Sequence, residues 1–148
     1  MIYLLNNPDK VLTLTGQHLV ITATALGIAI AIAVPLGLLL ARHPRLYGPV
    51  LTVLSVLYTI PSISLLVLLI PLMGLGFWPT ILALVIYCQV ILVRNVVVGI
   101  HGVSAAVLEA ARGMGLSGWQ IWWQVELPLA LPVILGGVRI ATISTIAI

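Results

Sequence analysis

Residues 19–41 read LVITATALGIAIAIAVPLGLLLA, a stretch of 23 residues without a charged side chain. A helix of this length spans about 35 Å, which is enough to cross the apolar part of a bilayer. The composition of the chain agrees, because 62% of its 148 residues are hydrophobic and only 6% are charged. So few charges cannot cover a water-facing surface, and the sequence therefore predicts an all-α, polytopic bundle of transmembrane helices.

A second apolar stretch, about residues 47–73, is long for one straight span and contains Pro61 and Pro71. Proline removes a backbone donor and clashes with the preceding turn, so we expect a kink or two half-helices that meet near Pro61. Four hydroxyl side chains in this stretch follow helical spacing and share one predicted face. They are Thr52, Ser55, Thr59 and Ser62.

Two more apolar segments complete the predicted bundle. The third covers about residues 80–100 if Arg94 reaches the headgroups, and the fourth covers about residues 129–148. The fourth is interrupted by Arg139, which either faces the bundle interior or extends to the membrane surface. A wetter loop at about residues 101–128 separates the last two spans.

We therefore expect residues 1–148 to form one transmembrane domain, apparently truncated at its C-terminus because no basic flank follows the last apolar segment. The chain begins without the basic start and cleavage site of a secretory signal, so the first span is expected to be retained. Its single cysteine, Cys88, and its scattered histidines predict no disulfide and no metal site. No phosphate-binding loop is present, so neither a cofactor nor nucleotide binding by this chain is expected.

Basic residues predict the orientation. Arg42 and Arg45 follow the first span, and Arg94 and Arg112 lie on the same side if the spans alternate. The positive-inside rule makes that side cytoplasmic, with the N-terminus outside and the 101–128 loop inside. Because most cations lie beside apolar runs, they indicate orientation in a lipid bilayer, and nucleic-acid binding is not expected.

The loop itself is predicted to form a helix, a turn and a second helix. Ser104 is a good N-cap and Gly115 a good left-handed terminator for the first helix. Ser117 and Gln120 have capping-box spacing for a second short helix, which we expect to end near Glu126.

This loop resembles the conserved loop of membrane subunits of ABC importers, which reads Glu-Ala-Ala, three residues, Gly, nine residues, Ile, one residue, Leu-Pro. The matching residues here are Glu109, Ala110, Ala111, Gly115, Leu127 and Pro128, with Val125 in place of Ile. The resemblance implies a MetI-like permease fold in a bacterial or archaeal cell (inner) membrane. It also implies that the loop inserts into a cytoplasmic ATPase subunit, so that ATP hydrolysis takes place on that partner and this chain is no enzyme.

A finer similarity to osmoprotectant permeases extends over nearly the whole chain, through segments such as Tyr58-Thr59-Ile60-Pro61-Ser62-Ile63 and Val93-Arg94-Asn95. It implies import of glycine betaine, carnitine or choline with an extracytoplasmic binding protein and a second permease copy or paralogue. Tyr58 and Tyr87 are too few to indicate an aromatic cage for such cations.

Several alternatives stay open at this point. The cargo could be an amino acid, methionine or an oxyanion, and the chain could be a secondary transporter, a channel or a non-transporting remnant. The hydroxyl face and Arg139 could line a translocation path, or serve helix packing and snorkelling.

Overall fold

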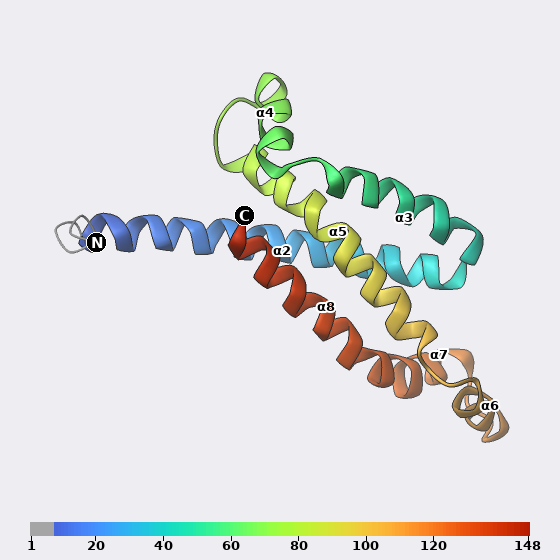
Figure 1. Ribbon diagram of the computed structural model, residues 1–148. Coiled ribbons are helices and arrows are strands. Elements are labelled where there is room, and N and C mark those ends of the chain that lie inside the picture. Colours follow the sequence, from blue (N-terminus) through green and yellow to red (C-terminus); the bar gives the residue numbers. More distant parts are fainter. Residues whose placement is uncertain (1–7) are drawn as a thin grey trace.

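The computed structural model describes residues 8–148, and within them the secondary structure is entirely helical (Figure 1). The prediction that the chain begins without a secretory signal rests mainly on residues 1–7, and these residues lie outside the described range. The helices are α2 (Pro8–Arg42), α3 (Pro44–Thr59), α4 (Ser62–Met73), α5 (Phe77–His101), α6 (Ala105–Gly113), α7 (Gly118–Ile121), the π-helix η1 (Trp122–Glu126) and α8 (Leu127–Ala147).

Helix α2 is longer than the apolar stretch that predicted it. It begins at Pro8, a residue whose fixed φ suits the first helical turn, and Asp9 places a negative charge beside the positive end of the helix dipole. The charge-free stretch marks only the part of this helix that suits lipid. Figure 1 shows the N-terminal part of α2 extending beyond the other helices.

The core forms where α5 packs between α2 and α8 (Figure 1). Small side chains on α2, every four residues, are fully buried there: Ala25, Ala29, Ala33 and Gly37. The sequence shows a second stripe with the same spacing, Ala23, Gly27 and Ala31, and those residues are exposed. Only the first stripe therefore lets α5 approach α2 closely.

The second apolar stretch forms two separate helices. Helices α3 and α4 meet at an angle of 94°, which is sharper than a kink in one rod. Ile60 and Pro61 have extended backbone angles, with ψ of 126° and 137°, and they form the break where the prolines predict it. Beyond the bend, Leu65 and Leu69 of α4 pack against Ala83 and Tyr87 of α5.

The expected end of the loop's second helix near Glu126 is wrong. Residues Gly118–Ala147 form one continuous helical run in which η1 joins α7 to α8. The Leu127 N–H donates to the carbonyl of Trp122, five residues earlier. This wider turn changes the pairing pattern just before Pro128, so the proline's missing donor does not end the helix.

Candidate functional site

The loop that carries the Glu-Ala-Ala pattern has a well-defined backbone. After α6, Gly115 has a φ of +80°, and its N–H donates to the carbonyl of Arg112 at 2.9 Å. The Leu116 N–H donates to the carbonyl of Ala111 at 3.3 Å. These two bonds form a Schellman motif, which requires a left-handed residue and so explains the glycine.

A capping box starts the next helix, as the sequence predicts. The Ser117 N–H donates to Oε1 of Gln120 at 2.8 Å, and the Gln120 N–H donates to Oγ of Ser117 at 3.4 Å. With the Schellman motif only two residues earlier, the turn between α6 and α7 is held from both sides. The two short helices therefore form a preorganised unit.

This unit projects from the end of the molecule where α5 ends and α8 begins, here called the loop end (Figure 1). Glu109, Ala110, Gly115 and Pro128 are exposed, Val125 and Leu127 are half-buried, and Ala111 is buried under the turn. Met114 and Trp119 are 74% and 69% exposed. The unit thus presents a carboxylate, a bare alanine surface and large apolar side chains to its surroundings.

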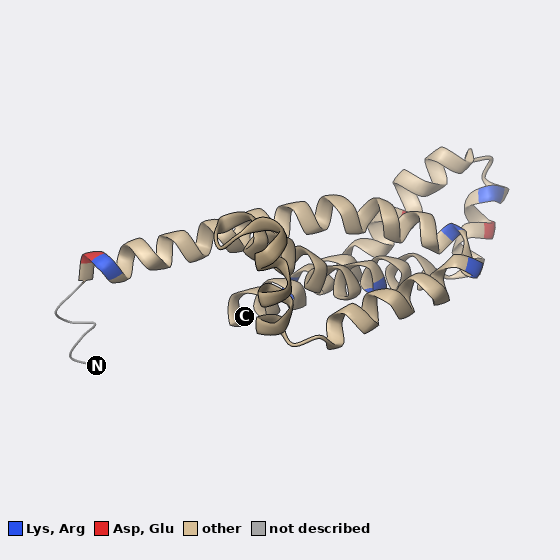
Figure 2. Ribbon diagram, turned by 90° about the horizontal axis from the view of Figure 1, so that it is seen from above, with Lys and Arg blue, Asp and Glu red and all other residues tan. Residues whose placement is uncertain are grey.

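Charge is concentrated at the two ends of the molecule. Figure 2 shows charged residues mainly at the loop end and at the start of α2, with an almost uncharged bundle between. Arg42, Arg45, Glu109 and Arg112 are all exposed and belong to the loop end. This distribution is typical of helices that cross an apolar layer.

The four hydroxyl residues of the second stretch do not stay on one surface. Thr52, Ser55 and Thr59 line a shallow groove along α3, while Ser62 lies beyond the break and lines a different cavity. Thr52 donates to the carbonyl of Gly48 at 2.9 Å, and Thr59 donates to that of Val56 at 2.6 Å. Both threonines therefore bond their own helix.

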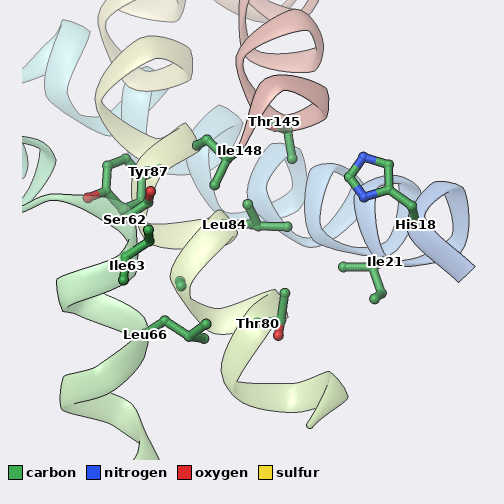
Figure 3. Close-up of a pocket in the computed structure, with 11 residues that line it drawn as sticks. His18, Ile21, Ser62, Ile63, Leu66, Thr80, Leu84, Tyr87, Thr145 and Ile148 are labelled. Carbon is green, nitrogen blue, oxygen red and sulfur yellow. The ribbon is translucent and has the colours of Figure 1, made fainter. Parts of the chain in front are cut away.

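The cavity at Ser62 has a volume of about 170 Å³ and lies between α2, α4, α5 and the end of α8. Figure 3 shows Ser62 beside the ring of Tyr87, with His18 at the far side. The Tyr87 hydroxyl is buried and bonds no described residue. The surface of the cavity is mostly apolar, with a few polar side chains on its walls.

A larger groove of about 490 Å³ lies on the loop-end side of Tyr87, between α3, α5 and α8. Ser55, Tyr58, Thr59, Arg94 and Asn95 contribute its polar groups. The rings of Tyr58 and Tyr87 meet edge to face with centroids 5.5 Å apart, so this pair stands between the groove and the Ser62 cavity. From the sequence, Arg94 was expected at the membrane boundary and belonged to the Val93-Arg94-Asn95 segment that resembles osmoprotectant permeases. Its place in a polar groove was not predicted, although an arginine inside an apolar span was an available signal.

Arg139 does not join these residues. Its neighbour Gly137 packs against Asn95 of α5, and two residues turn a helix by about 200°. Arg139 is accordingly exposed on the side of α8 away from α5. The hydroxyl residues and Arg139, which the sequence suggests as the lining of a translocation path, therefore lie on different surfaces of this chain.

Comparison with known proteins agrees with this architecture. Residues 33–147 match the family described as "Binding-protein-dependent transport system inner membrane component". The chain belongs to this family. The resemblance noted from the loop is thus confirmed, and the family consists of inner membrane components of transport systems.

Relatives of this inner membrane component carry the names that the finer resemblance predicts. The carnitine transport permease protein OpuCB of Listeria monocytogenes is 41% identical over 95% of the chain and 65% of its own length. The osmoprotectant import permease protein OsmW of Salmonella typhimurium is 42% identical over 99% of the chain and 70% of its own length. The chain spans about two thirds of the length of these relatives.

A solved structure shares the fold of this inner membrane component. A chain of the MetNI methionine ABC transporter, in an inward-facing form, superposes with a TM-score of 0.74 at 26% identity. The match covers 88% of this chain and 67% of the other. The predicted all-α, MetI-like permease fold is confirmed.

The lengths of the helices agree with a multi-pass membrane protein. Three helical runs of this inner membrane component are long and apolar enough to cross a membrane: Pro8–Arg42, Phe77–His101 and Gly118–Ala147. The bent pair α3 and α4 adds a fourth crossing if it counts as one span.

Proposed function

We propose that this chain is the membrane-spanning permease part of an ATP-driven importer, and that the α6–α7 unit docks on a cytoplasmic ATPase subunit. The observation that carries this proposal is the preformed, projecting loop with Glu109 and Ala110 exposed. A short helix held by a Schellman motif and a capping box enters a groove without a large ordering cost. Closure of two ATPase subunits would then move α5 and α8, the two helices that flank the loop.

The loop end is cytoplasmic in this proposal, and the start of α2 lies outside. Exposed arginines at the loop end favour this orientation under the positive-inside rule. A second permease copy or paralogue would face this one across a central path, and an extracytoplasmic binding protein would deliver the cargo. The setting is the inner membrane of a bacterial or archaeal cell.

The proposed cargo is an osmoprotectant such as glycine betaine, carnitine or choline. Relatives at 40–42% identity bear carnitine, osmoprotectant or glycine betaine/carnitine/choline in their names. The methionine transporter chain matches at only 26% identity. An amino acid is therefore the second candidate cargo.

Capture of the ATPase subunit by the detergent-purified chain tests the docking role. We expect the intact chain to retain the ATPase and Glu109→Lys and Gly115→Asp to lose it. Arg45→Glu is the matched control, since it reverses a charge at the loop end outside the α6–α7 unit and should leave capture intact. The proposal would be overturned if both loop variants still captured the ATPase. It would also be overturned if the intact chain captured none.

A further inference from the structure

The groove between α3, α5 and α8 contains a positive charge, and no acidic side chain is among the described residues that line it. Arg94 lies in α5, seven residues before the helix ends, and is exposed toward the groove. The three acidic residues, Asp9, Glu109 and Glu126, lie in α2's first turn and in the loop region, and none lines the groove. An arginine within a span is costly in lipid and usually serves an ion or substrate.

Two of the groove's other polar side chains are already engaged, and the remaining two, Ser55 and Tyr58, carry only neutral hydroxyls. Asn95 donates its side-chain amide to the carbonyl of Ile91 at 2.8 Å, and the Thr59 hydroxyl is bonded to Val56. Among the described residues that line the groove, Arg94 is the one with a positive charge and several donors to offer an incoming anion. A guanidinium binds a carboxylate through two parallel hydrogen bonds.

An aromatic ring lies in the same groove. Tyr58 is 42% exposed, and the edge-to-face contact with Tyr87 fixes its ring on the α3 wall. The face of a tyrosine ring attracts quaternary ammonium groups. The groove's volume of about 490 Å³ is within the range of small-molecule sites.

We propose that this groove is a binding subsite for a zwitterion whose carboxylate pairs with Arg94 while its quaternary ammonium group stacks on Tyr58. The proposal rests on the importer function above and narrows its cargo to carboxylate-bearing betaines. Choline has the ammonium group without the carboxylate, so its charge would meet Arg94 uncompensated. The subsite therefore favours glycine betaine and carnitine over choline.

A thiol-protection experiment tests the subsite in the assembled importer. Cys88 is 2% exposed, so a Ser55→Cys thiol in the groove is the reactive one, and its rate of N-ethylmaleimide labelling can be followed in vesicles. Glycine betaine at ten times its dissociation constant should slow labelling about tenfold, because occupancy lowers the free fraction by 1 + [L]/Kd. The same concentration of choline should protect less. Ser64→Cys, exposed on α4, is the matched control and should show no protection.

Substitutions of the two binding groups complete the test. In the Ser55→Cys chain, an added Arg94→Gln substitution should lower protection by glycine betaine to the level given by choline. An added Tyr58→Leu substitution should abolish protection by both compounds. Tyr58→Phe keeps the ring and should retain it, which separates loss of binding from misfolding. Unchanged protection in Arg94→Gln would overturn the subsite. The subsite would also be overturned if vesicles that take up labelled betaine showed no protection. Vesicles that take up no candidate cargo would instead contradict the importer function itself.

Discussion

Gly137 of α8 lies against the side chain of Asn95 on α5, so closely that a Cβ at residue 137 would be 2.7 Å from the Asn95 Cγ. Asn95 cannot easily move away, because its amide is bonded to the carbonyl of Ile91. This contact sets how closely α8 and α5 approach near the proposed subsite.

Gly137→Ala should therefore lower stability by about 1–3 kcal/mol, the usual cost of overpacking a tight contact. The adjacent Gly136 has open space around its Cβ position, and Gly136→Ala is the control. We expect only Gly137→Ala to lower the thermal unfolding midpoint in detergent. Equal midpoints for the two variants would show that the α5–α8 contact is looser than described.

A similar pair tests the contact between α2 and α5. A Cβ on Gly37 would lie 2.6 Å from both Cβ and Cγ1 of Val96, whereas Gly27 on the exposed stripe has nothing within 4 Å. Gly37→Ala should lower the unfolding midpoint, and Gly27→Ala should keep or raise it because alanine favours a helix by about 1 kcal/mol. The reverse order would mean that α2 presents its other stripe to α5.

Thr59 is expected to stabilise the break between α3 and α4. The Ile60 N–H turns to the carbonyl of Leu57, and the Thr59 hydroxyl bonds the carbonyl of Val56. Thr59→Val leaves that carbonyl without this partner and should cost about 1–2 kcal/mol in unfolding free energy. Thr52→Val removes a bond to a carbonyl within a regular helix and should cost much less. A similar loss for both variants would contradict a special role of Thr59.

Gly115 tests the preorganisation of the docking unit. Its φ of +80° costs a residue with a Cβ about 1–2 kcal/mol, so Gly115→Ala should weaken ATPase capture by roughly tenfold. Gly113 has open space and no positive φ, and Gly113→Ala should leave capture unchanged. The dissociation constant from titration with purified ATPase measures the difference. Tight binding by Gly115→Ala would show that the turn does not need its left-handed conformation.

Local features of the loop and of the break could be predicted from the sequence because neighbouring residues cause them. A glycine after a short helix, a Ser and a Gln three apart, and a proline in an apolar stretch act through the backbone within a few residues. The continuation of the helix past Pro128 could not be predicted from the sequence, since it depends on the π-helical turn at Trp122–Glu126. The Tyr58–Tyr87 pair was also missed, because its members lie on different helices.

Sequence alone was sufficient for the class of protein, the apolar segments and the break at Pro61, because hydrophobic length and backbone chemistry are local properties. Packing between helices selected Ala25, Ala29 and Ala33 over Ala23, Gly27 and Ala31, although both stripes recur every four residues. The 94° bend likewise separated Ser62 from Thr52, Ser55 and Thr59, and the packing of α3 on α5 left Arg94 and Tyr58 lining the same groove. Such choices depend on which surfaces of distant segments meet, and periodicity within one segment carries no information about its partner.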